Sequence, residues 1–295
     1  MRLAVTGRDG QVVRSLLEAG PAAGVEVIAI GRPVLDLERP ETIAPALAAA
    51  RPDVVVNAAA YTAVDQAEAE PDRAHLINAT AAGAVAAAAR ALGCPVIQIS
   101  TDYVFDGTKA APYGEDDPVG PAGVYGASKL AGERAVAAAS PDHAILRTAW
   151  VFAPFGKNFV RTMLHLGETR DEVRVVADQQ GCPTYAPDIA AAIIAVARNL
   201  KARPDDAALR GVFHMTGSGE TTWAGFAEAI FAGAAALGRR PVRVVPIPAR
   251  EYPTPARRPA NSRLDCGRLA RVHGVRLPAW PDALQRCLAR LCAPV

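Results

Sequence analysis

The chain has 295 residues, 51% of them hydrophobic, which is enough material for one large domain or two modest ones. Its formal net charge is only +2 and its basic residues are scattered, so composition gives no electrostatic basis for binding nucleic acid. No apolar run approaches the ~20 residues that a membrane-spanning helix needs, and a strand pattern starting at residue 2 leaves no room for a signal peptide.

Short apolar runs alternate with helical patterns through the first half of the chain. The predicted elements are a strand at 2–6, a helix at 11–19, a strand at 25–30, a helix at 42–51, a strand at 54–57, a helix at 73–92, a strand at 95–100, a helix at 125–139 and a strand at 143–147. Near-continuous apolar strands that alternate with helices predict the α/β class, with a doubly wound parallel sheet covered on both faces. Ligands of such sheets bind beyond the carboxyl ends of the strands, where the winding order switches.

The second half of the chain is less regular. It contains a helix pattern near 187–200, a strand near 212–215, a helix near 221–237 and a proline-rich stretch at 246–259. These pieces predict a smaller, discontinuous substrate-binding domain. We expect residues 1–154 and 187–215 to form the nucleotide-binding domain, and residues 155–186 and 216–295 to form the substrate domain, so that the chain crosses between them more than once.

A glycine-containing loop, Gly7-Arg8-Asp9-Gly10-Gln11-Val12-Val13, follows the first predicted strand. Its two glycines let the backbone turn tightly and approach a pyrophosphate, whose charge would rest on the amino end of the next helix. Val13 replaces the third glycine of the G-x-x-G-x-x-G pattern, so we expect the helix and strand to lie slightly further apart there. A plain strand-to-helix turn is the alternative. The position of the glycine loop at the start of a pattern of alternating strands and helices favours a Rossmann-like domain that binds NAD(P).

The end of the second predicted strand indicates which dinucleotide binds. The second strand ends in Ile30-Gly31-Arg32 without an acid, and Asp36 comes only after a proline. An acid there would hold a ribose 2′-hydroxyl, whereas an arginine accommodates a 2′-phosphate. The sequence therefore favours NADPH, with NADH also usable, although Arg32 is equally compatible with a solvated loop.

The third strand exits through Asn57-Ala58-Ala59-Ala60, where small residues would let the cofactor approach the backbone. A simple tight strand exit is the alternative.

Tyr125 and Lys129 lie four residues apart in a predicted helix, which places both side chains on one face. An ammonium beside a phenol favours the phenolate, so the pKa of Tyr125 is expected to fall from about 10 toward the working pH. Such a phenol can protonate a carbonyl oxygen or deprotonate an alcohol. Thr101, after the fourth predicted strand, is expected to hydrogen-bond the reacting carbonyl from the opposite side. For the isolated motif, an ordinary exposed helix pair is the alternative.

Together these features resemble the extended short-chain dehydrogenase/reductase family and, within it, the dTDP-4-dehydrorhamnose reductases. The narrower resemblance rests on strings that cover almost the whole chain, an ordered set that several nucleotide-sugar epimerases with the same glycines and Tyr–Lys pair lack. The strings are NAAAYTAVDQAE at 57–68, STDYVF at 100–105, VYGASKLAGE at 124–133, RTAWV at 147–151, GKNFV at 156–160, DQQGCPT at 178–184 and RPANSRL at 258–264.

The resemblance implies reduction of the C4 ketone of dTDP-4-dehydro-L-rhamnose to dTDP-L-rhamnose, which would make the second domain a sugar-nucleotide domain. It implies that Tyr125 is the proton donor, that Lys129 lowers its pKa and binds the nicotinamide ribose, and that Thr101 orients the keto oxygen. Further cofactor contacts that it implies are Gly7, Gly10, Gln11, Val12, Asp36, Leu37, Ala59, Ala60 and Thr62. Substrate contacts that it implies are Tyr103, Trp150, Asn158, Arg258, Asn261 and Ser262; for Tyr103 and Trp150, a core aromatic is the alternative.

The carboxyl-terminal region departs from this resemblance. Some members of the group dimerise through a metal held by glutamates there, but the last thirty-odd residues of this chain contain no glutamate, and Asp282 is the only acid after Asp265. We therefore expect no metal and no metal-bridged dimer, while another kind of oligomer stays open. The five cysteines are odd in number and lack a Cys-x-x-Cys pair, which predicts reduced thiols in a cytoplasmic protein.

Two other functions stay open at this stage. Another nucleotide-keto-sugar reductase, or a 4-epimerase that retains NAD through its cycle, would use the same first half. The regulatory β subunit of methionine adenosyltransferase also resembles these reductases and is a partner subunit, so the fold does not guarantee turnover. The complete set of Thr101, Tyr125 and Lys129 argues against the regulatory role.

Overall fold

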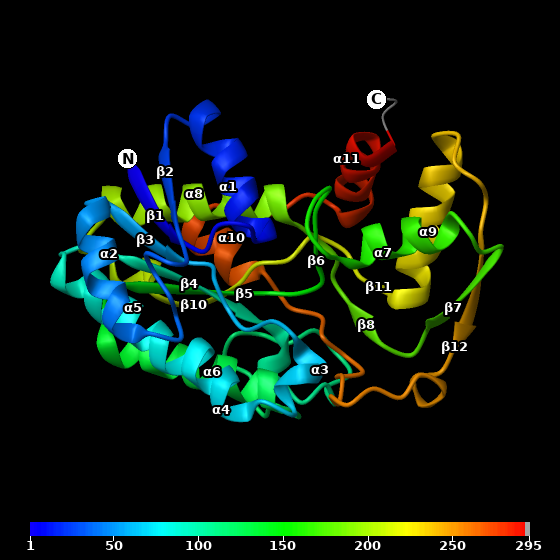
Figure 1. Ribbon diagram of the computed structural model, residues 1–295, viewed down its shortest axis with the longest axis horizontal. Coiled ribbons are helices and arrows are strands. Elements are labelled where there is room, and N and C mark those ends of the chain that lie inside the picture. Colours follow the sequence, from blue (N-terminus) through cyan, green and yellow to red (C-terminus); the bar gives the residue numbers. More distant parts are fainter. Residues whose placement is uncertain (293–295) are drawn as a thin grey trace.

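The computed structural model describes residues 1–292 and is organised around a sheet of six parallel strands (Figure 1). The strand order is β10-β5-β4-β3-β1-β2. The strands are β1 Arg2–Thr6, β2 Glu26–Ile30, β3 Val54–Asn57, β4 Val96–Thr101, β5 His143–Thr148 and β10 Gly211–His214. The middle strands are buried along nearly their whole length, which is why they read as continuous apolar runs.

Helices cover both faces of this sheet, as Figure 1 shows. On one face lie α1 Gln11–Ala22, α8 Ala186–Ala202 and α10 Gly267–His273, and on the other lie α2 Ile43–Ala50, α5 Ala81–Ala91 and α6 Val124–Ala139. Alternate side chains of each strand point to opposite faces, so Leu3 and Val5 of β1 pack in the first core, whereas Ala4 packs in the second. The predicted α/β architecture is confirmed.

The winding order of the sheet switches at β1, which pairs with β2 on one side and β3 on the other. At such a switch point the loops after the two strands diverge and leave a crevice. Here the crevice lies between the loop after β1, which begins at Gly7, and the exit of β3 at Ala58–Ala60. Thr101 ends β4, the next strand along. The topology therefore gathers the residues singled out in the sequence at one edge of the sheet.

The predicted helix at 73–92 contains an irregular turn that supports the opposite helix α6. It consists of α4 Pro71–His75, a π-helical turn at Leu76–Thr80 and then α5. In this turn Asn78 is buried, and its side-chain amide donates to Ser128 Oγ of α6 at 3.0 Å. Gly132 of α6 sits so close that a Cβ there would lie 2.0 Å from the Asn78 carbonyl oxygen. This close approach seats the helix that carries Tyr125 and Lys129.

A smaller lobe lies beyond the carboxyl edge of the sheet, on the right of Figure 1. Its core is formed mainly by three helices and a pair of parallel strands. These elements are α7 Phe159–Gly167, α9 Trp223–Ala236, α11 Trp280–Cys292, β7 Glu172–Val176 and β12 Arg243–Ile247. Two pairs of very short strands are also present. β6 Val151–Phe152 pairs with β9 Thr184–Tyr185, and β8 Gln180–Gly181 pairs with β11 Thr221–Thr222. A short helix, α3 Val64–Ala67, follows the exit of β3.

Every helix and strand predicted in the first half is present, and α8, β10 and α9 occupy the three segments predicted in the second half. Sequence patterns missed α3, α7, α10, α11 and all six strands outside the central sheet. α10 packs against α8 and β10, although its residues were expected in the substrate domain; the division of the chain into domains remains a prediction. Within residues 1–292 no helix combines the length and apolarity needed to cross a bilayer.

Candidate active site

Two adjoining cavities open along the carboxyl edge of the sheet. The first cavity, of about 620 Å³, lies between the glycine loop, the ends of β4 and β5, and the start of α6. The second cavity, of about 450 Å³, lies beyond the ends of β2 and β3. The two share Gly7, Asp9, Ala59, Ala60 and Thr62 in their linings. The two cavities therefore adjoin one another at the switch point of the sheet.

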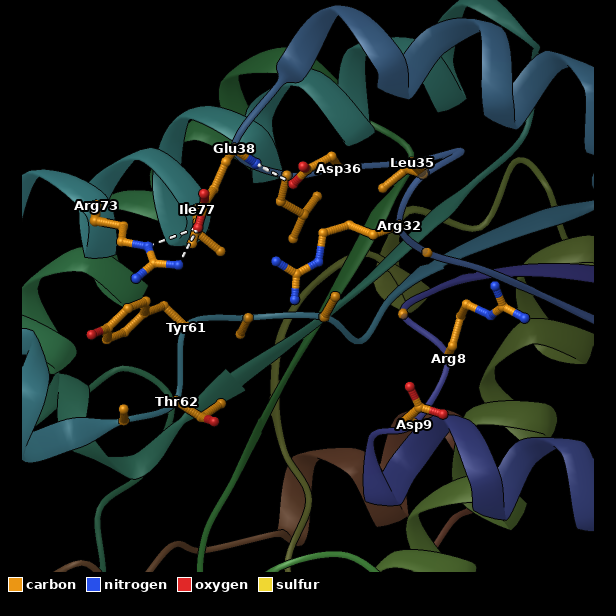
Figure 2. Close-up of a pocket in the computed structure, with 16 residues that line it drawn as sticks. Arg8, Asp9, Arg32, Leu35, Asp36, Glu38, Tyr61, Thr62, Arg73 and Ile77 are labelled. Atoms are coloured by element: carbon orange, nitrogen blue, oxygen red, sulfur yellow. Dashed lines mark hydrogen bonds and ion pairs between the residues drawn. The ribbon is translucent and has the colours of Figure 1, made fainter.

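The structure brings all the predicted cofactor residues into these two linings. Those of the first cavity are Gly10, Gln11, Val12, Tyr125 and Lys129; those of the second are Arg32, Asp36 and Leu37; and Gly7, Ala59, Ala60 and Thr62 border both. Figure 2 shows the second cavity, with Arg32, Asp36 and Leu35 on the strand-β2 side and Tyr61 and Thr62 on the strand-β3 side. Their contact with a cofactor remains a prediction.

The glycine loop has the geometry that a pyrophosphate requires. Gly7 has a φ of +98°, a conformation that residues with a side chain rarely adopt. A Cβ at Gly7 would lie 3.4 Å from Ala59 Cβ and 3.4 Å from Val13 Cγ2, so the backbone conformation, more than a lack of space, excludes a side chain there. Gly10 precedes α1 without capping it by a side chain, which leaves amide groups of the first helical turn available to an anion. The loop therefore fits a dinucleotide.

Thr101, Tyr125 and Lys129 all line the first cavity. The Lys129 ammonium donates to the backbone carbonyl of Ile99 at 2.7 Å. The Thr101 hydroxyl donates to Asp102 Oδ1 at 2.9 Å and accepts the backbone N–H of Tyr103 at 3.3 Å. The ring of Tyr103 meets that of Tyr125 edge-on, with centroids 5.4 Å apart. Two hydroxyl groups and an ammonium thus surround one space beside the glycine loop.

The expectation that Lys129 lowers the pKa of Tyr125 is wrong for this arrangement. Burial raises the pKa of Tyr125 to about 12, opposed by the Thr101 hydroxyl and reinforced by the Asp102 carboxylate. Burial also lowers the pKa of Lys129 to about 8, against the raising effect of Glu133. Burial disfavours the charged form of both groups, and it outweighs the attraction that the four-residue spacing suggested. At neutral pH the Tyr125 phenol is therefore protonated.

A buried ion pair joins Glu133 of α6, one turn beyond Lys129, to Arg147 of β5. Glu133 Oε2 and Arg147 Nη2 are 2.7 Å apart, with side chains only 5% and 4% exposed. Glu133 Oε1 also accepts the Ser100 hydroxyl at 2.5 Å. The pair therefore joins α6 to the ends of β4 and β5, and the Glu133 carboxylate is the charge that raises the pKa of Lys129.

Sequence reasoning missed Asp102. Its side chain is buried, and its Oδ2 has no hydrogen-bond partner among residues 1–292. Burial raises the pKa of Asp102 to about 6, while hydroxyls of Thr101 and Ser262 lower it. The signal was present, because an acid directly follows Thr101 at the end of β4, and Asp102 also lines the first cavity. Thr148, at the end of β5, also lines the first cavity, and its hydroxyl has no hydrogen-bond partner in the described part of the chain.

Of the predicted substrate residues, Tyr103 and Trp150 line the first cavity. Trp150 has a φ of +48°, which is strained for a residue with a bulky side chain. Its ring stacks on Trp223 with centroids 3.5 Å apart. On its edge lies Gly181, where a Cβ would come within 2.3 Å of the indole. Packing from the smaller lobe therefore holds Trp150 in place at the cavity.

The other predicted substrate residues lie outside the lining of the first cavity and make contacts within the protein. Asn158 caps α7 and donates to Gln11 Oε1 at 2.9 Å, which ties the smaller lobe to the glycine loop. Arg258 pairs with Asp65 of α3 at 2.9 Å. Asn261 donates to the carbonyls of Lys109 and Ala111, and Ser262 to that of Gln180. Their contact with a substrate remains a prediction.

Comparison with known proteins agrees with this geometry. Residues 1–293 match the model of the family described as the RmlD substrate binding domain. The chain is 52% identical to a dTDP-4-dehydrorhamnose reductase of Sinorhizobium fredii, over 97% of this chain and 96% of that one. A crystal structure of such a reductase from Clostridium acetobutylicum superposes with a TM-score of 0.91 at 38% identity, covering 99% of both chains. One from Bacillus anthracis, solved in complex with NADP, superposes with a TM-score of 0.88 at 35% identity, covering 97% of this chain and 98% of that one.

Proposed function

The chain belongs to the dTDP-4-dehydrorhamnose reductase family, and on this premise we propose that it reduces the C4 ketone of dTDP-4-dehydro-L-rhamnose to dTDP-L-rhamnose with NADPH. The observation that carries the proposal is that Thr101, Tyr125 and Lys129 line one cavity that is continuous with the glycine loop. Relatives over the full length of the chain are named for this activity, and one related structure contains NADP.

The two cavities would hold the two halves of the cofactor. The adenosine half would lie in the second cavity, against Asp36, Leu37 and Ala60. The pyrophosphate would rest on the amide groups after Gly7 and Gly10, where the start of α1 favours negative charge. The nicotinamide half would reach the first cavity beside Lys129. Bound there, NADPH would supply the hydride for C4 of the sugar.

Tyr125 would give a proton to the C4 oxygen. Its pKa of about 12 keeps the phenol protonated at neutral pH, which is the state that a general acid requires. The Thr101 hydroxyl would turn from Asp102 to the same oxygen, so that two donors stabilise the charge that develops there. Lys129 would hold the nicotinamide ribose beside Tyr125.

Tyr103 and Trp150 would flank the sugar and hold C4 toward the cofactor, a gain in orientation that lowers the barrier. The remaining predicted substrate residues would contact the part of the substrate farthest from C4, or would position the loops that they hold. These residues are Asn158, Arg258, Asn261 and Ser262. Because Trp150 is fixed by Trp223 and Gly181, the sugar would meet a preformed wall.

The test is an assay of NADPH absorbance with dTDP-4-keto-6-deoxyglucose and its 3,5-epimerase. We expect absorbance to fall only when this protein and the epimerase are both present, with dTDP-rhamnose as the product. Tyr125→Phe should lower turnover by roughly 10²–10⁴-fold with little loss of cofactor affinity. Tyr252→Phe is the matched control, because Tyr252 is 62% exposed and outside both cavities.

Each negative result has a separate meaning. Near-normal turnover by Tyr125→Phe would exclude Tyr125 as the acid. No turnover by a folded protein that binds NADPH would shift the assignment to another nucleotide-keto-sugar, and after that to a regulatory subunit.

A further inference from the structure

A proline-rich segment that follows β12 reaches back to the edge of the first cavity. This segment, residues 252–258, is called the strap below; it belongs to no helix or strand and follows a short 3₁₀ turn at Ala249–Glu251. In Figure 1 it is part of the orange chain that runs from the end of β12 toward α3. The strap therefore connects the smaller lobe to the helix that follows β3.

Asp65 of α3 holds the strap by two hydrogen bonds. Its Oδ1 accepts the backbone N–H of Ala256 at 3.2 Å, and its Oδ2 accepts the Arg258 guanidinium at 2.9 Å. Ala256 is only 3% exposed. Within residues 1–292, the other hydrogen bonds to the main chain of the strap stay inside the segment from 249 to 256. Asp65 is thus the contact that ties the main chain of the strap to the nucleotide-binding lobe.

Arg258 connects this contact to the lining of the first cavity. Burial and the Asp102 carboxylate raise the pKa of Tyr103, whereas the Arg258 guanidinium lowers that pKa by its charge and by a hydrogen bond. Tyr103 lines the first cavity, and its ring meets the ring of Tyr125. A guanidinium has five N–H donors, so its bonds to Asp65 and Tyr103 leave further donors for a ligand.

The same short helix also holds the opposite wall of this cavity. Val64, beside Asp65, is part of the cavity lining. Glu68, directly after α3, accepts the backbone N–H of Val124 at 2.9 Å. Val124 begins α6, the helix that carries Tyr125. α3 therefore joins the strap on one side to the start of the catalytic helix on the other.

We propose that Asp65 is a positioning residue for the sugar nucleotide, because it holds the strap in place and orients the Arg258 guanidinium toward the substrate's diphosphate. This rests on the proposed function in taking a sugar nucleotide as the ligand. Phosphate oxygens match the charge and the donor geometry of a guanidinium. A guanidinium that is already held loses less conformational freedom when the ligand binds. Asp65 lies outside the linings of both cavities, so it acts through Arg258 and the strap.

The first experiment measures the affinity of the full-length chain for thymidine 5′-diphosphate by calorimetry, and the steady-state constants for the sugar nucleotide and NADPH. Asp65→Ala should weaken thymidine diphosphate and raise KM for the sugar nucleotide by about 5- to 30-fold, the effect of losing one or two hydrogen bonds. KM for NADPH and kcat should stay near wild type. Asp65→Glu keeps the charge and should retain most of the affinity, with Asp65→Asn between the two.

Asp206→Ala is the matched control. Asp206 pairs with Arg203 at 3.1 Å and accepts the backbone N–H of Ala208 at 3.1 Å. Its side chain is 36% exposed, against 40% for Asp65, and it lies outside both cavities. This substitution should leave both KM values and the affinity for thymidine diphosphate unchanged.

Limited proteolysis reports on the strap without any turnover. Trypsin cuts after arginine unless proline follows, so within the strap it can cut between Arg257 and Arg258 but not between Arg258 and Pro259. Arg257 is exposed. Release of the strap in Asp65→Ala should speed cleavage after Arg257, relative to wild type and to Asp206→Ala, because cleavage follows local opening. Mass spectrometry of the fragments identifies the site.

Cleavage after Arg257 at the wild-type rate in Asp65→Ala would overturn the proposal, because the strap would not depend on Asp65. Faster cleavage with unchanged affinity for thymidine diphosphate would overturn the positioning role. Equal increases in KM for the sugar nucleotide and for NADPH would overturn it too, since a general disturbance of the fold acts on both.

The same measurements separate this proposal from the reductase assignment. A chain whose Asp65 variants bind thymidine diphosphate as described, but which reduces no keto-sugar, would retain the positioning role and lose the reductase assignment. A reductase with wild-type constants in all three Asp65 variants would retain the assignment and lose the positioning role.

Discussion

Glu133→Gln tests whether the buried pair of Glu133 and Arg147 stabilises the fold and whether Glu133 raises the pKa of Lys129. The substitution keeps the size of the side chain and removes its charge. It leaves the Arg147 guanidinium, whose side chain is 4% exposed, without a counter-ion in a buried site. Breaking a buried pair in this way costs about 3–5 kcal/mol, because the remaining charge can neither pair nor reach water.

The expected loss can be converted into a melting temperature. An unfolding entropy of roughly 2.1 cal/mol/K per residue over 295 residues is about 0.6 kcal/mol/K. A loss of about 3–5 kcal/mol therefore lowers Tm by about 5–8 °C, which is measurable by calorimetry. Glu18→Gln is the matched control, because the Glu18–Arg290 pair has side chains 45% and 46% exposed and should contribute under about 1 kcal/mol.

A second measurement reports on the active site. Burial lowers the pKa of Lys129 to about 8 and the Glu133 carboxylate opposes that shift, so removal of the carboxylate should lower the pKa of Lys129 further. If protonated Lys129 is needed, kcat/KM falls as pH rises through this pKa. The alkaline limb of the Glu133→Gln profile should therefore move to lower pH than that of wild type.

Loss of stability no larger than that of the control, or an alkaline limb that stays or moves to higher pH, would refute this reasoning. If Glu133→Gln fails to fold, the double variant with methionine at 133 and 147 becomes the test of stability. It leaves no unpaired charge and should fold better than the single variant.

Two further predictions concern packing and pH. Gly181→Ala should destabilise the protein by roughly 1–3 kcal/mol, because the new Cβ would come within 2.3 Å of the Trp150 ring. Displacement of that ring should raise KM for the sugar nucleotide more than KM for NADPH. Equal changes in the two constants, measured by steady-state kinetics, would count against this prediction. For His214, burial and the nearby Arg147 lower the pKa from 6.5 to about 3. As pH falls, the His214 imidazole of the unfolded chain is therefore protonated before that of the folded protein. Stability due to His214 is then fully present above pH 6.5 and is lost as pH falls toward 3, by up to about 1.4 kcal/mol per pH unit. Urea midpoints of His214→Asn should depend less on pH in this window, and an unchanged slope would contradict the assignment.

Much of the fold and part of the site could be predicted because their signals are local in the sequence. Apolar runs such as 54–57 became central strands, since strands buried on both faces must be apolar throughout. The glycine loop followed from its position after the first strand. The spacing of Tyr125 and Lys129 placed both on one helical face, and the topology then brought Thr101 into the same cavity. Each of these inferences needs only neighbouring residues and a known topology.

The smaller lobe was less predictable, because its elements are short and gain most of their stability from tertiary packing. α7 begins at a local signal, the side-chain cap of Asn158 on Arg161 N–H at 3.2 Å, and this signal was overlooked. The strands of the lobe had no comparable signal. β8 and β11 are two residues each, and their pairing joins segments about 40 positions apart.

The chemistry of the site depended on tertiary structure for a physical reason. A pKa responds to burial and to charges within a few ångströms, and these come from distant parts of the chain. The sequence alone placed a lysine near Tyr125; the tertiary structure directed that lysine to the Ile99 carbonyl and buried the phenol, so that its pKa rises. The strained backbone of Trp150 is likewise held by Gly181 and Trp223, which only folding brings beside it.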